Sequence, residues 1–264
     1  MIKKALIMTD LDGTFVYDSH RVRPADQAAF KALQEYYYVG IATGRSLKEI
    51  AYIEQQNKLQ ADCKIAFNGA TVINQRAQQL ICQPLAYEDL QAVLRYLQQK
   101  NLTFDALNGE QRIGNFASTD VQRLWGMELI TLKDPFMRVA QETIYKINVR
   151  PEVQRFESIA KDMKKRFKNL SLFESNGKRI EITAAGTSKG QALKLLQKSV
   201  ALPIIGIGDS GNDLAMFQNS DLAICMNHAT PKIKAQAKLT IDYFSDLLTY
   251  ESKFDQLIKE ADNV

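Results

Sequence analysis

The chain has 264 residues, of which 45% are hydrophobic and 24% are charged. At about 150 residues per domain this length favours two domains, and the apolar fraction can bury a core without disulfides or a structural metal. The 34 basic and 30 acidic residues are well interspersed and give a net charge of +4. This balance argues against a nucleic-acid-binding protein, which concentrates basic residues on one face.

The sequence also limits where the protein works. Cys63, Cys82 and Cys225 form no CxxC pair, so they predict a reducing compartment and no zinc site. The apolar run at residues 5–8 is too short for the core of a signal peptide. No run of about 18 apolar residues occurs, so no membrane span is expected. We therefore predict a cytoplasmic protein; the sequence does not reveal its oligomeric state.

Short apolar runs alternate with helical patterns in the first third of the chain and again in the last third. Buried strands are predicted at residues 4–9, 36–42, 64–67, 203–206, 222–225 and near 238–241. Helices are predicted at residues 24–33, 46–56 with Ser46 as its cap, 189–197 and 213–219. This alternation is typical of a Rossmann-like, doubly wound α/β domain with a parallel sheet.

The pattern between these thirds is different. Helices are predicted at residues 87–99, around 120–125 and at 153–167. Strands are predicted at 103–107, 112–116, 144–149, 171–174 and 178–183, with Asn176 and Gly177 between the last two. The sequence therefore predicts a second α/β domain, residues 84–184, inserted into a core made of residues 1–83 and 185–264.

Two aspartates follow the first predicted strand. Asp10 and Asp12 lie in the run Asp-Leu-Asp-Gly-Thr, at the end of a strand where open α/β sheets bind ligands. Alternate residues of a strand point the same way, so we expect both carboxylates to face one cleft, where a cation or a shared proton would relieve their repulsion. Gly13 allows a sharp turn there. Turn-forming aspartates with no catalytic role are the alternative.

A second acidic pair follows a later strand, in Gly208-Asp209-Ser210-Gly211-Asn212-Asp213. Asp209 and Asp213 could reach the same cation as Asp10, and Mg²⁺ prefers such hard oxygen ligands. Alternatively, Asp209 caps the next helix and Asp213 favours its dipole. The segment also fits a dinucleotide-binding glycine pattern and a serine-protease nucleophile, but the ribose-binding acid and the expected histidine arrangement are missing.

Two further segments could hold a phosphate. Thr43, Gly44 and Arg45 lie between a strand and a helix, where a hydroxyl, an approachable amide and a helix N-terminus form a cradle. Lys189 begins a helix, where a lysine is unfavourable to the helix dipole, so its placement suggests an anion nearby. A solvent-exposed lysine is the alternative.

The order of these motifs resembles the haloacid dehalogenase superfamily of phosphohydrolases: DxDGT, Thr-Gly-Arg, a downstream lysine and GDxxND, each at a strand end. The insert resembles the α/β cap of the Cof-like branch. The resemblance implies an enzyme that hydrolyses phosphoric monoesters of small metabolites, either sugar phosphates or phosphorylated cofactors, with Mg²⁺ as cofactor. It implies that residues 84–184 form a cap that selects the substrate.

The resemblance also implies a role for each motif residue. Asp10 is expected to be the nucleophile that forms an aspartyl-phosphate, and Asp12 the general acid and base. The implied Mg²⁺ ligands are Asp10, the main-chain carbonyl of Asp12, Asp209 and Asp213. The implied phosphoryl-binding residues are Thr43, Gly44, Lys189 and Asn212, with Lys189 also counted as catalytic.

Other functions remain compatible with the sequence. A phosphomutase or phosphotransferase could use the same residues, and a metabolite-binding regulator could keep the fold without turnover, although the acid/base Asp12 argues against the regulator.

The chain departs from the family pattern at residues 240–246 and at His228, where the family commonly has a small residue. His228 could contact a ligand or only fill a loop. The expected partner is a small phosphorylated metabolite, with no nucleic acid and no membrane.

Overall fold

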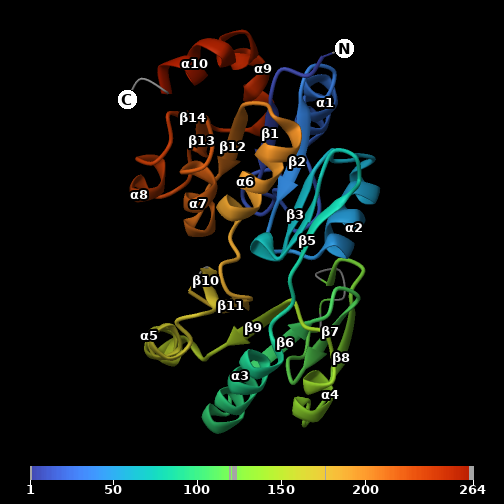
Figure 1. Ribbon diagram of the computed structural model, residues 1–264, viewed down its shortest axis with the longest axis vertical. Helices are drawn as coiled ribbons and strands as arrows, with labels where there is room; N and C mark the ends of the chain where they lie inside the picture. The colour runs from blue at the N-terminus through green and yellow to red at the C-terminus, as the bar shows by residue number, and fades with distance from the viewer. Residues whose placement is uncertain (1, 119, 121–123, 176, 262–264) are drawn as a thin grey trace. The chain divides into compact units, whose positions relative to one another are not determined.

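The computed structural model describes residues 2–118, 120, 124–175 and 177–261. The chain divides into two compact units (Figure 1). We call residues 1–81 and 188–264 the split unit and residues 82–187 the inserted unit. The sequence-based boundaries were 84 and 184.

The split unit contains an eight-stranded sheet with the order β14-β13-β12-β1-β2-β3-β4-β5. Its strands are β1 (Leu6–Thr9), β2 (Tyr38–Ala42), β3 (Lys64–Ala66), β4 (Thr71–Ile73), β5 (Gln79–Cys82), β12 (Ile204–Gly208), β13 (Leu222–Met226) and β14 (Leu239–Ile241). The six strands from β14 to β3 are parallel, and β4 is antiparallel to β3. The chain builds outward from β1 in both directions, which confirms the predicted doubly wound fold.

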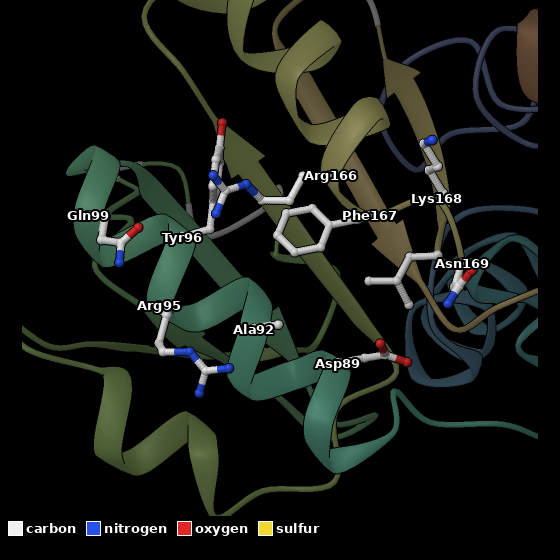
Figure 2. A pocket seen from close by; sticks show the side chains of 10 residues that line it. Asp89, Ala92, Arg95, Tyr96, Gln99, Arg166, Phe167, Lys168 and Asn169 are labelled. Atoms are coloured by element: carbon white, nitrogen blue, oxygen red, sulfur yellow. The ribbon is translucent and has the colours of Figure 1, made fainter.

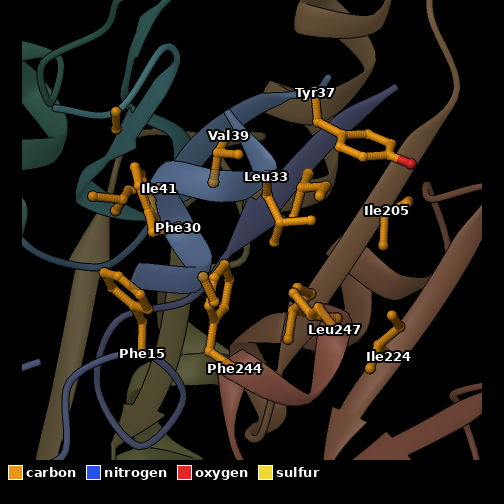
Figure 3. Packing of buried hydrophobic residues seen from close by; sticks show 14 of the residues in the cluster. Phe15, Phe30, Leu33, Tyr37, Val39, Ile41, Ile205, Ile224, Phe244 and Leu247 are labelled. Atoms are coloured by element: carbon orange, nitrogen blue, oxygen red, sulfur yellow. The ribbon is translucent and has the colours of Figure 1, made fainter. Parts of the chain in front are cut away.

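Both faces of the central strands β1, β2 and β12 are buried, which explains why these strands are largely apolar. Ile7 of β1 packs in one hydrophobic cluster with α1 (Pro24–Leu33) and α2 (Leu47–Asn57). Its neighbours Leu6 and Met8 point to the other face and pack with α6 (Lys189–Val200) and α7 (Leu214–Phe217). In the first cluster, the rings of Phe15, Phe30 and Phe244 lie together, with the Phe15 centroid 5.2 Å from Phe30 and 4.8 Å from Phe244 (Figure 3).

Local sequence signals fix several helix ends. Pro24 occupies the first turn of α1, where its missing N–H costs nothing. Ser46 caps α2, as predicted, and forms a capping box with Glu49. Ser188 caps α6 by accepting a hydrogen bond from the Gln191 amide. The helix predicted at 213–219 is shorter, because a 3₁₀ turn, η4 (Gly211–Asp213), comes before α7.

The prediction missed several short elements. They are the hairpin of β4 and β5, the helices α8 (Pro231–Lys234), α9 (Leu247–Tyr250) and α10 (Phe254–Ala261), and the 3₁₀ turns η1 (Phe67–Gly69), η5 (Phe244–Asp246) and η6 (Glu251–Lys253). Apart from α10, these elements have three or four residues and are too short to show a hydrophobic period, so pattern alone does not find them.

The inserted unit contains a six-stranded sheet with the order β10-β11-β9-β6-β7-β8. Its strands are β6 (Thr103–Leu107), β7 (Gln111–Gly114), β8 (Glu128–Thr131), β9 (Lys146–Arg150), β10 (Ser171–Ser175) and β11 (Arg179–Thr183). The pairs are antiparallel except β7 and β8, which are parallel. Its helices are α3 (Tyr87–Lys100), α4 (Phe136–Ala140) and α5 (Phe156–Arg166), the last preceded by η3 (Val153–Arg155).

The sequence predicted most of this unit but not β8 or α4. The helix expected around 120–125 falls largely outside the described residues, as does Asn176 of the predicted turn. Strand alternation divides the sheet into two faces. Phe104, Ile147 and Ile182 lie on the face that packs in one hydrophobic cluster with the helices. Their neighbours along the strands, Asp105, Asn148 and Glu181, lie on the opposite face, which is polar. Among the described residues, no helix is both long and apolar enough to cross a membrane.

Candidate active site

The candidate site lies where β1 and β12 end. These strands are parallel neighbours, and the Asp10 amide donates a hydrogen bond to the Ile207 carbonyl at 2.8 Å. Asp10 follows β1, and Asp209 follows β12, so the sheet brings both to the same edge. One carboxylate oxygen from each of Asp10, Asp209 and Asp213 lies within 4.8 Å of the others. We call these three residues the acidic cluster.

Lys189 is the buried cation of this site. Its side chain is 0% exposed, and Nζ lies 2.5 Å from Asp10 Oδ1 and 2.6 Å from Asp213 Oδ1. A buried ammonium of this kind is stable only when paired. The anion that its unfavourable helix position suggested is therefore supplied, at least in part, by two aspartates of the chain itself.

Burial and like charges shift the pKa values of this site. Burial raises the pKa of Asp10 well above its ordinary value; Lys189 opposes this shift, and Asp213, Asp209 and Asp12 add to it. Burial and Asp213 raise the pKa of Asp209, while His228 opposes the rise. Burial alone would lower the pKa of Lys189, but Asp10 and Asp213 raise it above its ordinary value. Lys189 therefore stays charged, and the acidic cluster has an excess of negative charge that favours a further cation.

Asp213 connects the cluster to its own loop. Its Oδ1 accepts from Lys189, and its Oδ2 accepts from the Asp209 and Ser210 amides at 3.0 and 2.9 Å. Ser210 is the N-cap of this turn and forms a capping box with Asp213. The alternative that Asp209 is the cap is therefore wrong. Asp213 holds the turn through its contacts with two main-chain amides, and it also pairs with the ammonium of Lys189.

Asp12 behaves differently from Asp10. Its carboxylate is 58% exposed and pairs with the buried guanidinium of Arg45, whose Nε donates to Oδ2 at 2.8 Å and whose second nitrogen donates to Oδ1. Arg45 also donates to the Ser19 carbonyl at 2.6 Å. The argument from strand alternation does not apply to Asp12, because β1 ends at Thr9 and Asp12 lies in the turn beyond it. That Asp10 and Asp12 face one cleft stays a prediction; the two carboxylates are close enough for the charge of Asp12 to raise the pKa of Asp10.

The predicted phosphate-binding residues form a connected edge. The buried Thr43 accepts a hydrogen bond at its carbonyl from the Asn68 amide at 3.0 Å. Asn68 Oδ1 accepts from Asn212 Nδ2 at 3.3 Å. Gly44 is partly exposed beside Thr43. The structure thus links the loops after β2, β3 and β12 at one edge of the sheet.

A glycine is required at position 13 because the backbone there lies very close to the Asp209 side chain. Its φ is +88°, and a Cβ at this position would lie 2.5 Å from Asp209 Oδ2. Asp209 also accepts from the Thr14 hydroxyl at 3.4 Å, and its Oδ2 lies 3.3 Å from His228 Nε2. The turn after β1 is therefore fitted around the Asp209 carboxylate.

A comparison with protein families identifies this arrangement. The model of the haloacid dehalogenase-like hydrolases matches residues 7–246. The chain belongs to this family. The predicted resemblance is confirmed, and with it the prediction of an enzyme of the phosphatase type.

Known proteins match this family member over nearly their whole length. A putative phosphatase from Haemophilus influenzae is 25% identical over 252 residues, which are 90% of this chain and 92% of the relative. A Bacillus subtilis protein named 5-amino-6-(5-phospho-D-ribitylamino)uracil phosphatase is 26% identical and covers 91% and 89%. A solved structure of a putative HAD/COF-like hydrolase from Plasmodium vivax has a TM-score of 0.83, 22% identity and 96% coverage of both chains, which shows the shared fold.

Sequence reasoning missed three contacts of this hydrolase. Arg45 stands in the quoted Thr-Gly-Arg motif, but nothing in that triplet shows that it pairs with Asp12. Asn68 lies in the run Phe67-Asn68-Gly69-Ala70, which resembles the Cof-like branch, but nothing in that run predicts its contact with Asn212. The sequence marks His228 as unusual without separating a ligand contact from a loop-filling role; the structure places its ring against Asp209.

A second buried charge cluster lies on the polar face of the inserted unit's sheet. Asp105 is 0% exposed, and it accepts from Arg150 at 2.6 and 2.9 Å, from Asn148 at 2.7 Å and from Arg112 at 3.3 Å. Burial alone would raise the pKa of Asp105, but Arg150 and Arg112 lower it below the ordinary value. The carboxylate is therefore ionised and ties three strands together.

The inserted unit also has an open hollow of about 510 Å³ between α3 and the residues after α5 (Figure 2). Arg95, Arg166 and Lys168 are among its lining residues, and the Arg166 guanidinium lies 5.3 Å from the centre of the Tyr96 ring. All of its lining residues belong to the inserted unit, and none belongs to the acidic cluster. We therefore assign the chemistry to the charged groups of the split unit and not to this hollow.

We predict that Asp105→Asn destabilises the protein by about 3–5 kcal/mol at pH 7, because it leaves two largely buried arginines without their carboxylate. Since the folded-state pKa of Asp105 is lowered, its stabilisation is present above the unfolded value of about 3.9 and is lost as the pH falls below it. Urea unfolding at pH 7 and at lower pH should show the difference from wild type shrinking below about pH 4.

The matched control is Glu88→Gln, which removes an exposed carboxylate from α3 and should change stability by less than about 0.5 kcal/mol. Equal stabilities of wild type and Asp105→Asn at pH 7 would contradict the assigned ion pairs.

Proposed function

We propose that this hydrolase is a Mg²⁺-dependent phosphatase that acts on small phosphorylated metabolites through an aspartyl-phosphate at Asp10. The observation that carries the proposal is the buried Lys189 between Asp10 and Asp213, with Asp209 within reach of both. A buried lysine beside carboxylates that can hold a divalent cation suits phosphoryl transfer, which depends mostly on positioning and charge stabilisation.

The donor set fits a divalent metal. The acidic cluster offers three carboxylates against one ammonium, and hard oxygen ligands are what Mg²⁺ prefers. We assign Asp10, Asp209, Asp213 and the main-chain carbonyl of Asp12 as the groups that would hold it. When bound, such an ion supplies charge stabilisation to the phosphoryl oxygens.

We assign each step of the reaction to residues of the chain. An oxygen of Asp10 attacks phosphorus while the bond from phosphorus to the leaving oxygen breaks, and Asp12, in its protonated form, gives that oxygen its proton. Asp12, now a carboxylate, takes a proton from water, whose oxygen attacks phosphorus and releases Asp10. Lys189 neutralises Asp10 and the phosphoryl group, and Thr43, Gly44 and Asn212 bind phosphoryl oxygens.

The substrate class is proposed from the relatives. The Bacillus subtilis relative is named for a phosphorylated ribitylaminouracil, and such a small phosphorylated metabolite fits this proposal. We assign substrate selection to the inserted unit as a cap, corresponding to the predicted domain 84–184. A cytoplasmic location remains a prediction of the sequence.

Asp10→Asn should lower phosphate release by about 10⁴-fold or more, because it replaces the attacking carboxylate with a neutral amide, which is a poor nucleophile. The measurement is phosphate release from a panel of sugar phosphates, phosphorylated cofactors and an aryl phosphate, with Mg²⁺ or with EDTA. EDTA should abolish turnover by wild type, and added Mg²⁺ should restore it.

The same panel separates the alternatives. Phosphoryl transfer to an added sugar phosphate without phosphate release would favour a phosphomutase. Binding without turnover on any compound would favour a regulator, and turnover that survives in Asp10→Asn would contradict the proposal.

Arg45 is expected to position Asp12. Arg45→Lys keeps the charge but loses the planar two-nitrogen contact, so kcat should fall about 10- to 100-fold with a smaller change in KM. Arg95→Lys, on an exposed helix position, is the control for changing an arginine. An unchanged kcat in a folded Arg45→Lys protein would show that Asp12 needs no such support.

A further inference from the structure

His228 lies on the turn that follows β13. Strands β13 and β12 are parallel, with Cys225 beside Gly208, so this turn and Asp209 leave the sheet at the same edge. The turn is held on both sides of the histidine: the Asn227 amide donates to the Ile241 carbonyl at 2.7 Å, and the Ala229 amide donates to the Met226 carbonyl at 3.0 Å. Main-chain hydrogen bonds on both sides of His228 therefore fix the position of its backbone.

The three carboxylates of the acidic cluster are not supported equally. Asp10 and Asp213 share the ammonium of Lys189. Asp209 has a different pair of partners: Thr14 Oγ1 at 3.4 Å from its Oδ1, and His228 Nε2 at 3.3 Å from its Oδ2. The Asp209 carboxylate, 15% exposed, thus depends on a hydroxyl and an imidazole for its orientation.

In the hydrogen bond between His228 and Asp209, the imidazole is the donor. An ionised carboxylate only accepts hydrogen bonds, so the imidazole donates from Nε2–H to Asp209 Oδ2. Hydrogen bonds of this type fix the orientation of metal-binding side chains and increase metal affinity. The His228 side chain is 55% exposed and contributes little to the core, so this contact is its main structural effect.

We propose that His228 is a positioning residue for the metal site, and that it acts by holding the Asp209 carboxylate in the orientation that binds the divalent cation. It acts through Asp209 and not as a ligand or a catalytic base. The inference rests on the proposed function, because it requires Asp209 to be a metal ligand, and it extends that function to a residue that the motif pattern does not contain.

The test measures binding of Mn²⁺, as a paramagnetic substitute for Mg²⁺, by counting the free ion with electron paramagnetic resonance and by calorimetry, with no substrate present. His228→Ala should weaken Mn²⁺ binding about 10-fold. His228→Gln, whose amide nitrogen can replace Nε2 as the donor, should stay within about threefold of wild type. Lys232→Gln, on the exposed surface of the next helix, controls for changes in local charge.

A double-mutant cycle with Asp209→Asn completes the test. In that background His228→Ala should change Mn²⁺ affinity less than twofold. Equal affinities of wild type and His228→Ala, an equal loss in both backgrounds, or nitrogen coupling from His228 to bound Mn²⁺ would overturn the positioning role. If Asp209→Asn itself left Mn²⁺ affinity unchanged, the proposed metal site would fail instead, so the two failures are distinguishable.

Discussion

The buried ammonium of Lys189 is the interaction on which the site depends. Asp10 and Asp213 are almost fully buried, and two carboxylates at this depth could not both stay ionised without a cation between them. Lys189 supplies that cation, and it is itself stable at this depth only because of the two carboxylates. The arrangement therefore opposes the rise that burial causes in the pKa of Asp10, and it places a poorly hydrated carboxylate at a strand end, as an attack on phosphorus requires.

The parallel sheet makes this contact possible. Asp10 and Lys189 are 179 residues apart in the chain, and the whole inserted unit lies between them in sequence. β1 and β12 are nevertheless adjacent, and α6 packs on the same face as Leu6 and Met8 of β1. The apolar strands thus do more than form a core: they fix where the charged loops meet, and Gly13 lets those loops approach closely.

The sequence predicts what strand ends and motif order determine. Asp10, Asp209, Asp213 and Lys189 were found because each follows or begins a strongly patterned element, and the doubly wound fold follows from the same alternation. The partners of Arg45, His228 and Asp105 could not be found, because each contact joins segments that only the folded sheet brings together. The turn at Asp12 shows the limit of periodicity: the strand ends at Thr9, and alternation no longer applies.

The most direct measurement asks whether Asp10 carries the phosphoryl group. Asp12→Asn protein, in which loss of the base should slow hydrolysis of the intermediate, would be mixed with the aryl phosphate, whose leaving oxygen needs no proton from Asp12, and treated with borohydride. Mass spectrometry of the peptide containing Asp10 should then show homoserine at position 10, formed only when substrate was present. Substrate turnover by wild type, with residue 10 unmodified in the trapped variant and a phosphoryl group found on another side chain, would contradict the account.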